Sequence, residues 1–73
     1  MSVFDWIARE RVRKAKELLE TSDYRISEIA TMVGFGSSET LRRNFEKIAG
    51  SSAGAYRELF RPASLPVMAY SER

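Results

Sequence analysis

The segment 38–48 carries the side chains best suited to chemistry with a partner molecule. Glu39, Thr40 and Arg43 come together toward one side of a helix with 3.6 residues per turn. An arginine can donate two parallel hydrogen bonds to guanine N7 and O6, a glutamate can accept from the cytosine amino group, and a threonine methyl can contact a thymine methyl. We therefore predict that these three residues form a base-reading face for DNA.

The same residues permit a plainer interpretation. Glu39 and Arg43 are four residues apart, so they could pair with each other on a free helix surface. Other polar and cationic residues nearby suit phosphates or groove walls, and contacts of that kind position a protein without reading sequence. These candidate backbone-contacting residues are Ser27, Ser37, Ser38, Arg42 and Lys47.

Two short helical patterns would position these residues. Apolar residues recur with the three-and-four spacing of an amphipathic helix over 26–33, and again at Leu41, Phe45 and Ile48 in 38–48. We expect the second set to be buried, because Glu39 and Arg43 then fall on the opposite side of the helix.

A glycine turn separates the two patterns. Gly34 sits where a helix commonly ends in a residue of positive φ, and Ser37 sits where the next helix takes a side-chain cap. Ser27 is a candidate cap for the first helix. Helix, glycine turn and capped helix are the layout of a helix-turn-helix.

A long amphipathic helix is predicted before this motif, over 4–20. Its outer face carries pairs four residues apart, namely Glu10 with Lys14, Arg13 with Glu17 and Lys16 with Glu20. Its basic residues could follow a phosphate backbone, or they could be a solvated face neutralised by these glutamates. The basic residues are Arg9, Arg11, Arg13, Lys14 and Lys16. The expected buried stripe is Phe4, Ala8, Val12, Ala15 and Leu19.

The remaining segments complete a small domain. The residues 21–25 lack a helical period and read as a loop. Ser52 and its neighbour Ser51 offer a cap for a last helix over 53–60, which would bury Ala55, Tyr56, Leu59 and Phe60. Met32 is expected in the core. We expect a helix-turn-helix domain over 1–62 and a flexible C-terminal tail over 63–73, because Pro62 stops the last helix.

Composition narrows the functional class. The chain has 73 residues, 44% of them hydrophobic and 30% charged, which is typical of one small globular domain. It contains no cysteine and no histidine, which removes thiolate metal sites and the commonest general base. We therefore expect no enzyme activity, metal or cofactor.

No membrane span or signal peptide is visible, and a cytoplasmic location is expected. The net charge is only +2, so the placement of charge matters more than its total.

A family resemblance covers roughly residues 6–60. The run Ile26-Ser-Glu-Ile-Ala-x-x-Val-Gly-Phe35 is followed at fixed spacing by Ser37, Leu41, Arg43, Phe45, Gly50 and Tyr56-Arg57. This pattern resembles the second half of the DNA-binding domain of AraC/XylS-type transcription regulators. The resemblance implies an all-α, homeodomain-like fold in which the helix over 4–20 connects two helix-turn-helix units, the first of which is absent from this chain.

The resemblance also implies a function. Family members bind double-stranded DNA in the bacterial nucleoid and are usually activators, with an effector-binding domain elsewhere in the protein. The base-contacting positions of the family fall on Glu39, Thr40 and Arg43, with Ser38 and Arg42 adjacent. The alternative is a protein-interaction module that contacts RNA polymerase or the missing half-domain, in which case Trp6 would pack against that half. One departure is Ala53, where the family usually has proline, and we expect the helix to form nevertheless.

Overall fold

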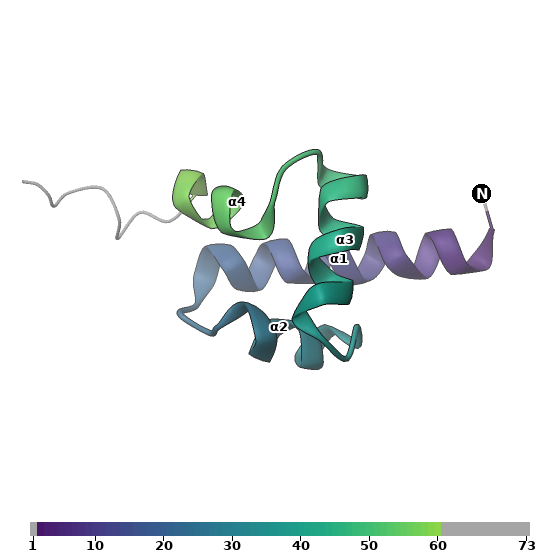
Figure 1. Ribbon diagram of the computed structural model, residues 1–73, viewed down its shortest axis with the longest axis horizontal. Coiled ribbons are helices and arrows are strands. Elements are labelled where there is room, and N and C mark those ends of the chain that lie inside the picture. Colours follow the sequence, from purple (N-terminus) through teal and green to yellow (C-terminus); the bar gives the residue numbers. More distant parts are fainter. Residues whose placement is uncertain (1, 61–73) are drawn as a thin grey trace, which may run out of the picture.

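The computed structural model describes residues 2–60, which form four α-helices (Figure 1). The helices are α1 (Val3–Thr21), α2 (Ile26–Val33), α3 (Ser38–Ala49) and α4 (Ala53–Phe60). The all-α prediction is confirmed, and each predicted helix agrees with the observed one to within a residue at either end. The stop at Pro62, the domain boundary there and the tail over 63–73 lie outside the described residues.

Helix α1 is the element on which the other three pack, and Figure 1 shows α3 crossing it. The buried core joins all four helices. Ala15 of α1 has no side chain beyond Cβ, which lets the partner helices approach closely. The fully buried hydrophobic residues are Val12, Ala15, Leu19, Ile29, Ala30, Leu41, Phe45 and Ala53.

The predicted buried stripe of α1 is wrong at its N-terminal end. Val12, Ala15 and Leu19 are buried as expected, but Phe4 is 82% exposed and Ala8 is only half-buried. The periodicity continues into the first two turns of α1, whereas the described partner helices cover mainly the later turns. A helical stripe marks the side of a helix that can be buried, and burial itself needs a neighbour.

The predicted core of α4 also needs correction. Ala55, Leu59 and Phe60 are exposed, and Ala53 is buried instead. Tyr56 is half-buried and packs edge-on against Phe45, with ring centroids 5.5 Å apart. Helix α4 has only eight residues and contacts the rest of the domain along one narrow face, so its C-terminal turn remains exposed to solvent. Ala53, in place of the family proline, does begin this helix, as predicted.

Two details of α2 differ from expectation. Met32 is 51% exposed, because it lies on the outer face of α2 rather than with the buried Ile29 and Ala30. Ser27 does not cap the helix, since α2 already begins at Ile26 and the cap position is Arg25. The Arg25 backbone N–H donates instead to the Glu28 carboxylate, with 2.7 Å between nitrogen and oxygen.

The charged pairs predicted along α1 do not form among the described residues. Arg13 reaches back to Glu10, with 3.0 Å between Nη2 and Oε1, rather than forward to Glu17. Glu20 accepts a hydrogen bond from the Tyr56 hydroxyl, and the Lys16 ammonium lies 5.9 Å from the centre of the same ring. Tyr56 of α4 is therefore the partner of both Lys16 and Glu20, which were expected to pair with each other.

Arg57 links α4 to the C-terminal end of α1 through hydrogen bonds. Its guanidinium donates to the carbonyl oxygens of Ser22 at 3.0 Å and Tyr24 at 2.6 Å, and more weakly to that of Leu19 at 3.4 Å. Carbonyl groups at a helix C-terminus lack intrahelical partners, and a cation there is favoured by the helix dipole. One side chain thus fixes both the 22–25 loop and the position of α4.

Gly34 and α1 meet at the turn between α2 and α3. Gly34 has φ of 100° and ends α2, as predicted. A Cβ atom at this position would lie 3.1 Å from Arg11 Nε. The Arg11 guanidinium also lies 6.0 Å from the centre of the Phe35 ring. The turn is therefore held against α1 by Arg11.

We predict that Gly34→Ala lowers the free energy of unfolding by about 1–2 kcal/mol, because a side chain at positive φ is strained. Gly54→Ala is the matched control. Gly54 is inside α4 with open space around its Cβ position, so alanine should raise stability by about 0.5–1 kcal/mol. Urea denaturation measures both changes, and a neutral Gly34→Ala would contradict the role given to the turn.

Tyr56 should make stability sensitive to alkaline pH. Burial of the ring, followed by its hydrogen bond to Glu20 and that carboxylate's charge, raises the pKa of Tyr56 from 10.0 to about 12. The neutral phenol is favoured in the folded state, so this stabilisation is fully present below pH 10 and is lost as the pH rises through 12. The difference in unfolding free energy between the wild type and Tyr56→Phe should therefore shift against the wild type over this range. A pH-independent difference would show that the contact is not maintained in solution.

Candidate nucleic-acid interface

Helix α3 has one buried and one exposed side. Leu41 and Phe45 are fully buried and Ile48 is half-buried against the core, as predicted. Because successive residues are rotated by 100° around a helix, this burial turns Glu39 and Arg43 toward solvent. Both are exposed. The rotation of α3 about its own axis is therefore fixed by its apolar side.

Glu39 and Arg43 do not pair with each other. Within residues 2–60, no carboxylate oxygen lies within 4.0 Å of the Arg43 guanidinium, and the Glu39 carboxylate accepts no hydrogen bond. The plainer interpretation of these residues as a surface ion pair is therefore not what the structure shows. Arg43 keeps all its donors available, and Glu39, in the first turn of α3, also suits the positive end of the helix dipole.

The start of α3 is organised by Ser37. Its Oγ atom accepts from the Thr40 backbone N–H at 3.2 Å and lies 3.0 Å from the Thr40 hydroxyl, to which it donates. The predicted cap is therefore confirmed. Thr40 is half-buried, and its carbonyl oxygen accepts from the Asn44 amide at 2.9 Å. Ser38, the first residue of α3, is half-buried beside them.

One flank of α3 faces the N-terminal half of α1 across a small cavity. The cavity has a volume of about 110 Å³ and brings Lys47, a predicted backbone-contacting residue, close to α1. Asn44 was not among the predicted site residues. Its position between the buried and exposed sides of the helical wheel was the signal that could have identified it. The lining residues are Asp5, Ala8, Arg9, Asn44, Lys47 and Ile48.

The other flank of α3 faces the start of α4 across a wider depression of about 490 Å³. It brings Arg42 and Arg43 together with Ser52, whose Oγ atom caps α4 by accepting from the Ala55 N–H at 3.1 Å. Cationic side chains therefore stand on both flanks of α3. Ser52 was predicted only as a cap, because contact between α3 and the start of α4 is not visible in the local sequence.

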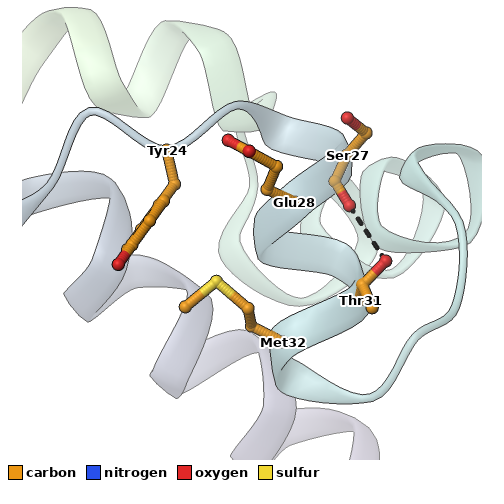
Figure 2. A pocket seen from close by; sticks show the side chains of 5 residues that line it. All are labelled: Tyr24, Ser27, Glu28, Thr31 and Met32. Carbon is orange, nitrogen blue, oxygen red and sulfur yellow. Dashed lines mark hydrogen bonds between the residues drawn. The ribbon is translucent and has the colours of Figure 1, made fainter.

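Ser27 lies apart from the other candidate residues. It lines a depression of about 490 Å³ on the outer face of α2, and no residue of α3 lines this depression (Figure 2). The Thr31 hydroxyl donates to the Ser27 carbonyl oxygen at 3.3 Å. Figure 2 shows Tyr24 and Met32 side by side at the apolar end of this surface. The structure thus brings together the residues of α3 and leaves Ser27 on a separate surface.

Within residues 2–60, no three acidic side chains gather closely enough to hold a metal ion. None of the helices described there combines the length and the apolar character that crossing a membrane requires.

Comparison with known proteins agrees with the geometry of α2, the glycine turn and α3. A family profile described as a helix-turn-helix domain, of the AraC type, matches residues 1–59. The chain belongs to this family. Within the AraC-type domain, α2 and α3 are the two helices of the motif, and α1 is the long helix that precedes them.

Relatives of this AraC-type domain are much longer proteins. The uncharacterised HTH-type transcriptional regulator YfiF of Bacillus subtilis is 34% identical over 65 residues, which cover 89% of this chain and 20% of that protein. The HTH-type transcriptional regulator Rv1931c of Mycobacterium tuberculosis is 36% identical over 55 residues, which cover 75% and 21%. The chain spans about a fifth of the length of these curated relatives. No solved structure matches it.

The cap of α3 can be tested through its effect on the stability of this AraC-type domain. We predict that Ser37→Ala lowers the free energy of unfolding by about 1 kcal/mol, because the Thr40 N–H loses its acceptor. Ser37→Asn should retain most of the stability, since asparagine also caps helices. Ser38→Ala, one residue further on, should change stability by less than about 0.5 kcal/mol. Calorimetric melting of the four proteins checks this order, and equal melting of the Ser37→Ala and Ser38→Ala variants would disprove it.

Proposed function

We propose that this chain is the sequence-specific DNA-binding part of a transcription regulator, and that α3 enters the major groove. The observation that supports this most directly is the division of α3. Its apolar side is buried, while Glu39 and Arg43 face solvent without partners in the described part of the chain. A helix with its side chains is about 10–12 Å wide, and the major groove is about 12 Å wide, so the groove admits α3.

Each candidate residue is assigned a role by its chemistry. Arg43 donates in bidentate fashion to guanine, Glu39 accepts from cytosine, and the Thr40 methyl contacts thymine. Arg42 and Lys47, on the two flanks of α3, bind phosphates of the two strands. Ser37 and Ser38 lie at the start of α3 near the groove wall, and Ser27 would contact the backbone beyond it.

The same proposal extends to the whole protein. The relatives are named as transcriptional regulators and are about five times longer than the matched segment. We place an effector-binding domain in the remainder of the protein. We also propose activation as the regulatory outcome, which rests on the family resemblance alone. A cytoplasmic location is the corresponding expectation.

A second candidate function is a protein-interaction module, and one observation favours it. Val3, Phe4 and Trp6, in the first turns of α1, are 70%, 82% and 58% exposed. Apolar side chains gathered at one end of a helix are typical of a surface that another protein covers. A second helix-turn-helix unit is the occupant that the family resemblance suggests, and RNA polymerase is the alternative. DNA binding by α3 is compatible with either.

We predict that Arg43→Ala and Lys47→Ala have different effects on DNA binding. The measurement uses a duplex enriched from a randomised pool by the wild-type chain, together with a scrambled duplex, at two salt concentrations. Arg43→Ala should reduce the preference for the enriched duplex by about 1–3 kcal/mol, because the guanine contact is lost. Lys47→Ala should weaken binding to both duplexes alike and lower the salt slope by about 0.9.

The two variants act as controls for each other, because each removes one positive charge from α3. If the Arg43→Ala variant still prefers the enriched duplex over the scrambled one, another residue must read the base. Equal wild-type affinity for both duplexes would contradict sequence-specific binding altogether.

A further inference from the structure

We infer that Arg9 of α1 and Lys47 of α3 together bind a single phosphate of the DNA backbone, on the flank of α3 that faces α1. This phosphate clamp rests on the proposed function, since it requires α3 to lie in the major groove. It assigns a DNA contact to α1, the long helix outside the helix-turn-helix motif.

The two cations share a cavity between the helices. Arg9 and Lys47 both line the cavity of about 110 Å³, and both are exposed to solvent at its rim. A cavity of roughly 10–15 Å³ already admits one water molecule, so this one has room for phosphate oxygens. Within residues 2–60, neither cation lies within 4.0 Å of a carboxylate oxygen or donates a hydrogen bond.

The charge and the donors of the cavity suit a phosphodiester. Asp5 is the one carboxylate among its lining residues, so two cations and one anion leave a net charge of +1. A guanidinium can hold two phosphate oxygens in bidentate fashion, and an ammonium adds a point charge. Asn44 uses one amide hydrogen on the Thr40 carbonyl and retains a second donor beside them.

Arg9 stands out from the other basic residues of α1. Arg11 lies against Gly34 and the Phe35 ring, Arg13 pairs with Glu10, and Lys16 lies over the Tyr56 ring. In the described part of the chain only Arg9 and Lys14 remain without such a partner. Lys14 lines a different cavity, with Trp6 and Val33, away from α3.

The position of the clamp matches the expected path of the backbone. A helix in the major groove has a phosphate strand along each flank. On one flank, Arg42 and the capped start of α4 meet the first strand. On the other, the N-terminal half of α1 projects beyond α3 (Figure 1). Arg9 and Lys47 line the cavity between these two helices, over which the second strand would pass.

The test uses the full chain and the enriched and scrambled duplexes, with the variants Arg9→Gln, Lys47→Gln and the double variant. Lys14→Gln is the matched control, because it removes the same charge from the same helix. Arg9→Gln should weaken binding to both duplexes about tenfold and lower the salt slope by about 0.9. The double variant should lose less than the product of the two single effects, because both residues bind one phosphate. Asp5→Asn should tighten binding. Circular dichroism should show unchanged folding for all the variants.

A second measurement locates the phosphate. Each phosphate of the enriched duplex is replaced in turn by an uncharged methylphosphonate. The wild type should lose affinity at one position at which Arg9→Gln and Lys47→Gln both become less sensitive and the double variant becomes insensitive. Insensitivity at two different positions would show two separate contacts and overturn the clamp.

The outcomes separate this inference from the proposed function. If the wild type prefers the enriched duplex but Arg9→Gln behaves like Lys14→Gln, the clamp is wrong and the proposed function stands. If the wild type binds DNA without preference and without a salt slope, the proposed function fails and the clamp fails with it.

Discussion

The burial of Leu41 and Phe45 against α1 is the interaction on which the exposed face of α3 depends. Both side chains are fully buried, and Phe45 also packs against Tyr56 of α4. A change of one residue in the buried register would rotate α3 by about 100° and carry Arg43 away from the DNA side. The residues proposed to read bases contribute little to the core, yet their direction is set by two buried residues.

Within residues 2–60, the cations that hold the fold together differ from those on α3. Arg11 and Arg57 serve the fold, one against the glycine turn and the other on the carbonyl groups at the end of α1. Arg42, Arg43 and Lys47 remain without internal partners within the described residues and gather on α3. The cations that stabilise the fold contact a ring, a carbonyl or a carboxylate within the domain. The cations proposed to bind DNA have no such contact in the described part of the chain.

The features that were predictable from sequence are local ones. The turn at Gly34, the cap at Ser37 and the buried side of α3 each depend on residues no more than four positions from the next, and all are confirmed. Features that depend on distant elements were predicted less well. Phe4 follows the helical period but has no neighbour to cover it, and Glu20 pairs with a tyrosine 36 residues away. The empty space beside Lys47 likewise appears only when α1 and α3 are placed together.

Because the net charge is small, the placement of the cations around α3 matters for DNA binding. A net charge of +2 over 73 residues provides little general attraction to a polyanion. Three of the five basic residues of α1 contact other groups of the domain, namely Arg11 the Phe35 ring, Arg13 the Glu10 carboxylate and Lys16 the Tyr56 ring. In the proposed binding mode, the attraction to phosphates would then come mainly from a few cations at the flanks of α3. If the non-specific part of the binding energy is small, the proposed base contact from Arg43 would account for a larger share of the total. The proposed base contact would then discriminate among sequences even where the overall affinity is low.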